Sequence, residues 1–472
     1  MPLSTSLLFF WCIFCLTSCS GEQSSVSTVH KEAQPNIVII LADDMNWNDI
    51  GVYGNPDVQT PNIDKLAKQG MRFNNAFSGT AMCSPARQQF LTGLYPVHSG
   101  AFSNHAGVKF GTKSMASYFR EIGYRTALNG KTHFGPPESF PFNHLDFNKY
   151  PDMKEPRKLK FDETRSFILA ESTEPFILVF GSHNPHWNWS GGNRESFDPE
   201  TIRVPEQYVD TPETRDAMVR YYAEISVLDD EVGIILNLLE EAGIEDDTLV
   251  LFATEHGAMF PYAKWTLYDL GIRAGFIARW PGKIRPGSYS DAMIHYVDVL
   301  PTLLDIINGS PDDTDGTSFL EVLTENKSDH RDHVFGLHTT RPIRHSKADY
   351  AIRSVRSKQH KLILNLNHEN VFSNNITEVN RGGFFESWGL LDDKDAQKKY
   401  LRYRHRPAVE LYDLTSDPAE QYNLAGNKSY AQIEKDLKRL LRDWMREQND
   451  PGAELERMAA AGANKVEMAP LE

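Results

Sequence analysis

Four largely apolar stretches of the sequence end in side chains that can bind a cation or move a proton. In chain order, these side chains are Asp43 and Asp44, Lys131 and His133, His183 and His186, and Glu255 and His256. Hard divalent cations such as Ca²⁺ and Mg²⁺ prefer carboxylate oxygens, and histidine is the commonest general acid or base. A single acid at a strand end would be read as the cap of the next helix. Four such ends together favour a cation site with acid–base groups beside it.

Cys83 is the only cysteine of the chain beyond residue 19. It opens the segment CSPARQQFLTG, in which Ser84 is the expected N-cap of a short helix, Pro85 its first helical residue and Gly93 its stop. The free backbone N–H groups at a helix start favour anions, and Arg87 can fold back to add a planar set of donors. The segment therefore fits a grip for an oxyanion, but a buried structural cysteine before an ordinary capped helix explains it as well.

The apolar stretches predict buried β-strands that would bring their end residues together. They cover residues 36–44, 124–135, 175–187 and 248–257, and such runs are typical of strands covered on both faces. Apolar residues at helical spacing predict helices over 61–70, 114–123 and 215–243. Alternating strands and helices predict an α/β three-layer sandwich with a mainly parallel central sheet. Ligands of such sheets bind beyond the carboxyl ends of the strands, where the four sets of side chains are expected to meet.

The pattern changes near residue 350. Short strands over 350–367 and an amphipathic helix over 430–450 predict a small antiparallel α+β subdomain. The predicted division is a catalytic domain over 35–349, a C-terminal subdomain over 350–450 and a tail over 451–472.

The N-terminal residues predict export. Residues 7–16 (LLFFWCIFCL) are too short an apolar run to span a bilayer but suit the core of a signal peptide. The following LTSCS resembles the lipobox of bacterial lipoproteins, with Cys19 as the lipidated residue, although no Lys or Arg precedes the run. We expect a lipoprotein signal peptide over 1–18, a flexible tether over 19–34, and a protein on the periplasmic or cell-surface face of a bacterial membrane. A plain cleaved signal and an uncleaved anchor are the alternatives.

The charge of the chain limits its partners. A formal net charge of −15 over 472 residues argues against nucleic-acid binding, which needs a basic surface. One stretch, 339–361, is nevertheless basic and contains a single acid, Asp349. Its cations are Arg341, Arg344, Lys347, Arg353, Arg356, Lys358 and Lys361. They predict either subsites for the anionic groups of a polymeric substrate, or a solvated basic surface. Trp187 and Trp189 are likewise expected either to stack on a sugar or to pack in the core.

Several motifs resemble those of one enzyme family. CSPAR followed by LTG resembles the C-x-P-x-R signature of type I sulfatases, and GKTHFG resembles their G-K-x-H-x-G segment. NIVIILADD, NPHW, GIRAGFIARWPGK and ELYDLTSDPAEQYNLA resemble further segments of the same family along most of the chain. The resemblance implies an alkaline phosphatase-like fold. It also implies that a formylglycine-generating enzyme converts Cys83 to formylglycine (3-oxoalanine).

The resemblance also implies roles for individual residues. One divalent cation, usually calcium in this family and with magnesium possible, would be bound by the modified Cys83 together with Asp43, Asp44, Glu255 and His256. Arg87 would steady the formylglycine hydrate, Lys131 and Lys264 would hold sulfate oxygens, and His133 and His186 would transfer protons. The family usually has Asp followed by Asn or His where this chain has Glu255 and His256, so Glu255 departs from the pattern.

The expected function is hydrolysis of sulfate esters in a sulfated poly- or oligosaccharide, either an algal polysaccharide such as ulvan or a glycosaminoglycan. The motifs look closest to the N-sulfoglucosamine sulfohydrolase-like group, and O-sulfate is favoured over N-sulfate. One alternative is a phosphonate monoester hydrolase or phosphodiesterase of the same superfamily. The other is a catalytically dead, lipid-anchored glycan-binding protein.

Overall fold

Eight strands of the computed structural model form one mainly parallel sheet. The structure describes residues 1, 34–146, 159–325, 327–379 and 383–462, so the expected signal peptide and Cys19 lie outside the described residues. The strands are β1 (Asn36–Ala42), β2 (Met71–Phe77), β3 (Arg125–Gly130), β4 (Asn143–Leu145), β5 (Phe176–Gly181), β6 (Thr248–Thr254), β7 (Arg273–Arg279) and β8 (Ser288–His295). Their order is β4-β3-β5-β1-β6-β7-β2-β8, and β7 runs antiparallel to both of its neighbours. The predicted mainly parallel sheet is confirmed.

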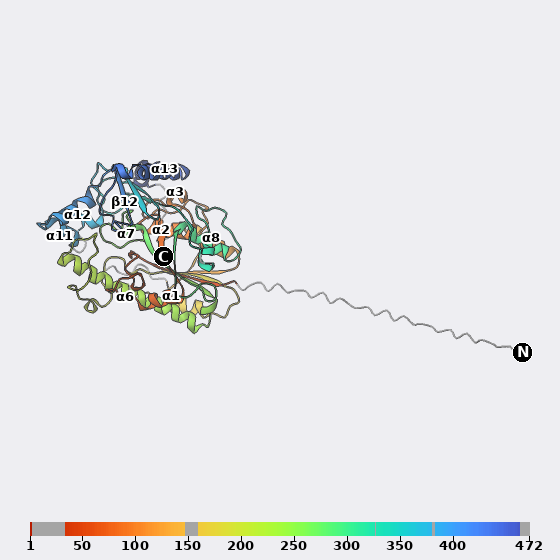
Figure 1. Cartoon of the computed structure of the whole chain (residues 1–472). Helices are drawn as coiled ribbons and strands as arrows, with labels where there is room; N and C mark the ends of the chain where they lie inside the picture. The colour runs from red at the N-terminus through yellow and green to blue at the C-terminus, as the bar shows by residue number, and fades with distance from the viewer. Residues whose placement is uncertain (2–33, 147–158, 326, 380–382, 463–472) are drawn as a thin grey trace. The chain divides into compact units, whose positions relative to one another are not determined.

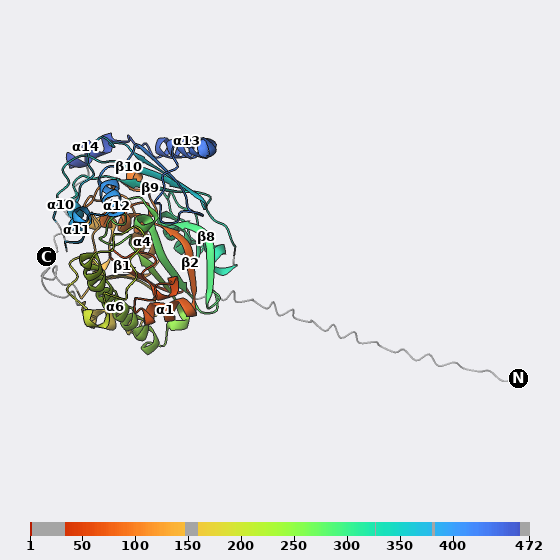
Figure 2. The same ribbon diagram turned by 60° about the vertical axis from the view of Figure 1, so that its left-hand side comes forward.

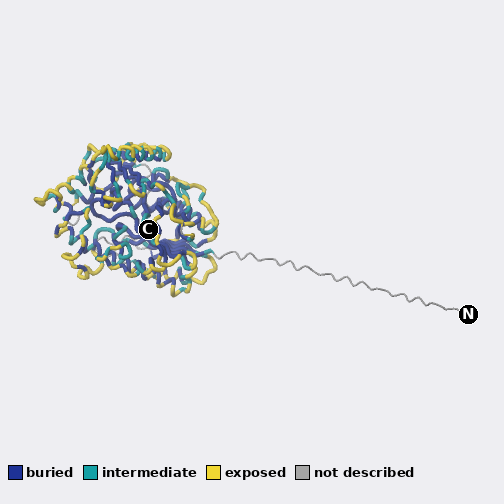
Figure 3. The backbone as a smooth tube through the Cα atoms, viewed as in Figure 1, coloured by how far each residue is buried: buried dark blue, intermediate teal, exposed yellow. Residues whose placement is uncertain are grey.

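Helices cover both faces of this sheet. Side chains of β1 alternate between two cores: Val38 and Ile40 pack in the core that includes α1 and α6, while Ile37 and Ile39 pack in the core that includes α2, α4 and α8. The helices are α1 (Pro61–Gln69), α2 (Cys83–Thr92), α3 (Pro96–Ser99), α4 (Met115–Glu121), α5 (Asp162–Ile168), α6 (Pro212–Glu241), α7 (Asp269–Ile272), α8 (Val299–Asp305) and α9 (Leu320–Thr324). Figure 1 shows α1 and α6 together on one side, and Figure 3 shows the buried segments gathered in the middle. The predicted three-layer sandwich is confirmed.

A second, antiparallel sheet follows in the chain. It has the order β12-β11-β10-β9, with β9 (Val334–His338), β10 (Ile352–Arg356), β11 (His360–Asn365) and β12 (Val409–Asp413). The remaining helices are α10 (Asn375–Glu378), α11 (Phe384–Leu390), α12 (Lys394–Arg404), α13 (Ala431–Glu447) and α14 (Glu454–Ala460). Helix α13 packs Leu437, Leu441 and Trp444 against this sheet, and Figure 2 shows α13 near β9 and β10. The predicted antiparallel C-terminal subdomain is confirmed.

Two details of the C-terminal region differ from the sequence prediction. The sheet begins before residue 350, at β9. This strand was not predicted, because a loop with few apolar residues separates it from β10. Helix α14 lies in the expected tail, yet Leu455 and Ala459 are buried in the same core as α13. The short apolar spacing of α14 is too weak a signal to predict a packed helix from sequence.

Helix α2 begins earlier than predicted. Its N-cap is Met82, so Cys83 is already helical, and Ser84 makes no capping hydrogen bond. Ser84 Oγ instead donates to the carbonyl oxygen of Ala106, 3.1 Å away. The predicted stop is confirmed, since Gly93 follows the helix with φ 71°, a conformation that glycine adopts freely. Within the part of the chain that is described, no helix combines the length and apolar character needed to cross a membrane.

Candidate active site

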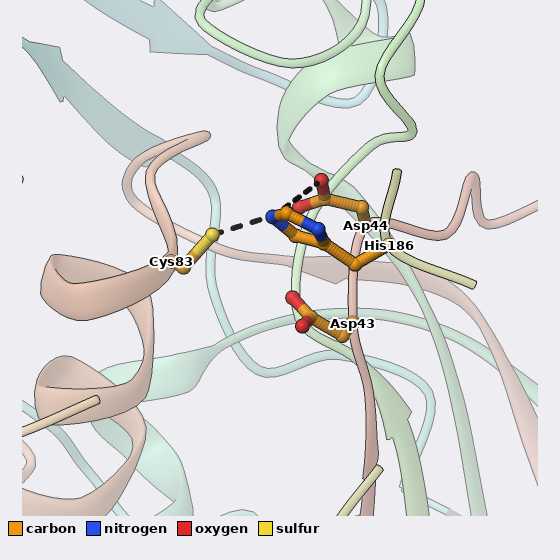
Figure 4. Close-up of side chains that lie close together, drawn as sticks. All are labelled: Asp43, Asp44, Cys83 and His186. Carbon is orange, nitrogen blue, oxygen red and sulfur yellow. Dashed lines mark hydrogen bonds and ion pairs between the residues drawn. The ribbon is translucent and has the colours of Figure 1, made fainter. Parts of the chain in front are cut away.

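The four predicted strand ends meet at one edge of the central sheet. Strands β3, β5, β1 and β6 are neighbours and run parallel, so their carboxyl ends lie side by side. Lys131 and His133 follow β3, and His186 comes after β5. The two aspartates follow β1, and Glu255 and His256 follow β6. Helix α2 brings Cys83 to this edge, and Figure 4 shows the sulfur facing Asp44 and His186. The structure thus brings together residues that are far apart in the chain; Asp44 and Lys264, for example, are separated by 220 positions.

Each aspartate after β1 is bonded to one lysine. Lys131 Nζ donates to both oxygens of Asp43 at 2.7 Å, and Lys264 Nζ donates to both oxygens of Asp44 at 2.5 Å. Burial alone would raise the pKa of Asp43, but the neighbouring Lys131 holds that pKa well below its ordinary range. Asp43 is therefore ionised at neutral pH, and the lysine is fixed beside it.

Cys83 lies in a buried, cationic environment. Its Sγ is 3.2 Å from Lys264 Nζ and 3.6 Å from Asp44 Oδ1. Burial would raise the pKa of the thiol, but Lys131 and Lys264 hold that pKa well below its ordinary value. Position 83 therefore favours a negative charge, as a site for an anionic substrate group must.

Arg87 orients Glu255. Its Nε and Nη2 both donate to Glu255 Oε2, at 3.1 and 2.9 Å, and both side chains are almost completely buried. Arg87 Nη1 also donates to the carbonyl oxygen of Lys131 at 3.4 Å. One carboxylate oxygen of Glu255 is thus committed to Arg87, and the other is left for a different partner.

The remaining atoms fit a divalent cation. Glu255 Oε1 and His256 Nε2 are buried 3.8 Å apart, and neither has a hydrogen-bond partner within the described residues. His256 Nδ1 lies 2.9 Å from the carbonyl oxygen of Gly257, so Nδ1 carries the proton and Nε2 presents its lone pair. Two sets of possible ligands each have atoms within 4.8 Å of one another: Asp43, Asp44, Cys83 and His186, and Cys83, Glu255 and His256. Carboxylates with one or two imidazoles can bind such an ion. The unpaired Glu255 Oε1 and His256 Nε2 are buried atoms that are available as its ligands.

Two histidines lie beside this cluster, one partly exposed and one buried. The His186 side chain is 21% exposed and that of Lys264 only 1%, and His186 Nε2 is 3.5 Å from Asp44 Oδ2. His133 is 7% exposed, and burial lowers its pKa to about 3, so its imidazole is neutral at neutral pH.

Helix α6 holds the loop that carries His186. Glu231 accepts hydrogen bonds from Ser182 Oγ at 2.6 Å and from Asn184 Nδ2 at 3.2 Å. Earlier on the same helix, Glu224 accepts a hydrogen bond from the backbone N–H of Ser190 at 2.7 Å. Neither acid was predicted from the sequence. Acids on the buried face of an amphipathic helix are a usable signal, because a buried acid costs stability unless it is paired.

Three of the seven cations of the basic stretch are internal, which corrects both sequence interpretations for those three. Arg353 is fully buried and donates to Asp450, with 2.8 Å between Nη2 and Oδ1. Arg356 and Lys361 both bond Asp269, at 3.0 and 2.7 Å, and are also buried. These three cations serve neither a glycan nor the solvent. Their acidic partners are distant in sequence, so the local count of charges hid them.

The two tryptophans have different surroundings. Trp189 is 5% exposed, stacks on Phe260 with ring centroids 5.0 Å apart, and donates its indole N–H to the carbonyl oxygen of Pro185. For Trp189 the core interpretation is therefore confirmed. Trp187 is only half-buried and keeps a sugar-stacking role as a prediction.

His105 is a site residue that sequence analysis missed. Its Nδ1 lies 2.8 Å from Nε2 of His133, and its ring is exposed. It lies in a loop with no motif and no periodic pattern, so the sequence offered no signal for it.

Comparison with known proteins identifies the family. Residues 35–310 match the family described as Sulfatase, and residues 254–375 match the family described as N-sulphoglucosamine sulphohydrolase, C-terminal. The chain is 32% identical over 466 residues to an ulvan-active sulfatase of Formosa agariphila, with 94% of this chain and 89% of that protein covered. It is 27% identical to N-sulphoglucosamine sulphohydrolase of Homo sapiens, with 88% of this chain and 91% of that protein covered.

A solved structure has the same fold. The structure of BT4656 in complex with its substrate D-glucosamine-2-N,6-O-disulfate matches with a TM-score of 0.68 at 20% identity. The match covers 89% of this chain and 99% of the other. The family match spans more than half of the chain, and the first relative named exceeds 30% identity over nearly all of it. The chain is therefore an enzyme of the sulfatase family.

Proposed function

We propose that this sulfatase hydrolyses sulfate esters of a sulfated poly- or oligosaccharide through a formylglycine formed from Cys83. The observation that carries the proposal is the environment of Cys83, which is a buried position at a helix start with the Lys264 ammonium 3.2 Å from its sulfur. A thiol needs no such cationic surroundings to pack in a core. A residue that must receive and release a sulfuryl group does need them.

The modification would give position 83 a chemistry that neither an unmodified cysteine nor a serine has. As a hydrated aldehyde, residue 83 would supply one hydroxyl to attack sulfur and a second hydroxyl whose deprotonation releases sulfate. The chain's own residues would do the rest of the work. Arg87 would hold the Glu255 carboxylate in one orientation through its two hydrogen bonds. Lys131 and Lys264 would hold the sulfate oxygens.

Two histidines would move the protons. His186 would protonate the leaving alcohol, because it is the partly exposed ring and lies 3.5 Å from the carboxylate of Asp44. His133 would accept the proton of the second hydroxyl, since it is a buried neutral imidazole that interacts with position 83. The two rings thus divide the acid and base roles between them.

The proposed cation is Ca²⁺, with Mg²⁺ as the alternative. Asp43, Asp44, Glu255 and His256 would hold it together with residue 83. When bound, such an ion supplies Lewis-acid stabilisation of the sulfate oxygens and acidifies a hydroxyl group. The unpaired Oε1 of Glu255 and Nε2 of His256 support this assignment.

Sulfated glycans are the proposed substrates because the relatives named above act on ulvan and on N-sulphoglucosamine. We place O-sulfate ahead of N-sulfate.

Within the described residues Arg344 is exposed and has no ion-pair partner. The loop of Arg344 is joined to the loop that contains His105, because Thr339 Oγ1 donates to the carbonyl oxygen of Phe102 at 2.9 Å. Arg344 is therefore the proposed contact for an anionic neighbouring sugar.

Sulfate release from defined sulfated oligosaccharides tests this function. We expect protein produced with the formylglycine-generating enzyme to release sulfate from O-sulfated members of an ulvan and glycosaminoglycan panel. Cys83→Ala should release none, and near-normal release by that variant would end the proposal. Faster cleavage of aryl phosphonate esters would favour the phosphonate hydrolase alternative. Glycan binding without sulfate release, despite confirmed formylglycine, would favour the binding-protein alternative.

We also propose that the chain is an exported lipoprotein anchored through Cys19, on the support of residues 7–20 alone. The intact protein should partition into the membrane fraction of a bacterial host, and Cys19→Ala should release it. An equal membrane-bound fraction for that variant would contradict lipidation.

A further inference from the structure

His105 touches the site but has no role in the chemistry described so far. Its loop is pinned to helix α2 and to the segment after β3: the carbonyl oxygen of Ala106 accepts from Gln88 Nε2 at 2.7 Å, and Val108 N–H donates to the carbonyl oxygen of Gly135 at 2.8 Å. His105 itself has φ 66°, a conformation uncommon for a residue other than glycine. The fold therefore holds the backbone of His105 in one conformation, and the 2.8 Å contact with His133 places its ring.

The hydrogen bond between His105 and His133 has a direction that the chemistry constrains. A neutral imidazole donates from one nitrogen and accepts at the other. Nε2 of His133 is engaged with His105, while its Nδ1 is buried and has no hydrogen-bond partner within the described residues. The His133 ring also interacts with the sulfur of Cys83. If His133 is to accept a proton from residue 83, its Nδ1 must carry the lone pair and its Nε2 the hydrogen.

We propose that His105 is a positioning residue, whose Nδ1 accepts the Nε2–H of His133 and so holds His133 in the tautomer with its Nδ1 lone pair available to residue 83. His105 then carries its own hydrogen on Nε2, which its exposure leaves to the solvent. The inference rests on the proposed role of His133 as the base that releases sulfate. Without His105, the His133 hydrogen is free to occupy Nδ1, and the ring then cannot act as that base.

Two variants and a control test this role in the matured enzyme. His105→Leu should lower kcat by about 10–100-fold, the usual cost of losing the partner that orients a functional histidine, with little change in KM. His105→Asn should recover most of that loss, because its amide oxygen can accept the same hydrogen bond. His368→Leu, which alters another exposed histidine, should leave both constants unchanged.

Nitrogen-15 NMR of the imidazoles in the resting enzyme supplies a readout that does not depend on turnover. With His133→Gln used to assign the signals, His133 should be the Nε2–H tautomer in the wild type and should lose that preference in His105→Leu. A wild-type His133 protonated on Nδ1 would overturn the inference, as would His105→Leu raising KM with kcat intact, or His105→Asn being no better than Leu. Failure of the wild type to release sulfate would instead count against the proposed function.

Discussion

Glu255 shows how single residues divide their work in this site. Its Oε2 accepts both hydrogen bonds from Arg87, and its Oε1 is left buried and unpaired beside His256 Nε2. The longer side chain explains how a glutamate can serve where the family usually has aspartate, because it spans the distance between a guanidinium and the proposed cation.

This division predicts the effect of Glu255→Gln. The amide must give its only oxygen to Arg87, which turns its NH₂ group toward the proposed cation. We expect the Ca²⁺ concentration that restores half of the activity after chelation to rise by at least about 10-fold, the loss that even an indirect contact of a metal site causes. Glu240→Gln, an exposed acid, is the control. Equal Ca²⁺ requirements for the variant and the wild type would remove Glu255 from the cation site.

Some residues of the candidate site could be predicted from the sequence and others could not. The carboxylates and histidines at strand ends were visible because apolar strands stop at them, and their meeting follows from parallel topology. Lys264 follows no strand, so only the resemblance to sulfatases indicated it. His105 could not be predicted, because its contact with His133 depends on how a loop without a pattern folds over helix α2.

Helix α6 is the element that ties the histidine loop to the body. It places Glu231 beneath Ser182 and Asn184, close to His186 in the chain. Burial raises the pKa of Glu231 from 4.5 to about 8, so the folded protein keeps this side chain protonated at neutral pH.

This shift fixes the sign of a pH dependence. Between about pH 5 and pH 8 the unfolded chain has lost the Glu231 proton while the folded chain retains it, so this group makes stability fall as pH rises. Glu231→Gln copies the protonated form and removes the effect. The melting temperature of the variant relative to wild type should therefore be higher at pH 8 than at pH 5. Glu240→Gln should show no such trend, and a trend of opposite sign for Glu231→Gln would contradict a raised pKa.

At the level of elements, the strands before the site and the long helix α6 were predicted because their periodicity is strong. Strand β9 and helices α11, α12 and α14 were not, because short elements carry few periodic residues and are fixed by packing instead. The start of α2 was placed too late, since Ser84 has the residue type of a cap but spends its hydroxyl on the Ala106 carbonyl.

In the whole molecule, a buried ion-pair cluster joins the two sheets. Asp269, the first residue of α7 and close in the chain to β7, is bonded to Arg356 and Lys361 of the C-terminal sheet. Lys361 Nζ also lies 3.3 Å from Glu420. The acidic net charge and the basic stretch were both visible in the sequence. The pairing of the buried cations Arg356 and Lys361 with Asp269 could not be predicted, because the partners lie about ninety residues apart in the chain.

Removing the shared acid should be costly. Asp269→Ala leaves two buried cations without their main partner and should lower the free energy of unfolding by about 3–5 kcal/mol. Denaturant unfolding measures this change. Glu241→Ala, which breaks an exposed ion pair with Arg165, should cost less than about 1 kcal/mol. Equal effects of the two substitutions would show that the cluster does not hold the sheets together.

The mass of the peptide that contains residue 83 tests the central claim most directly. Preparations made with graded amounts of the formylglycine-generating enzyme would be assayed for sulfate release and digested for mass spectrometry. We expect kcat to rise in proportion to the fraction of formylglycine at position 83 and to extrapolate to zero in its absence. Full activity in protein whose Cys83 is still an unmodified thiol would contradict the proposed mechanism.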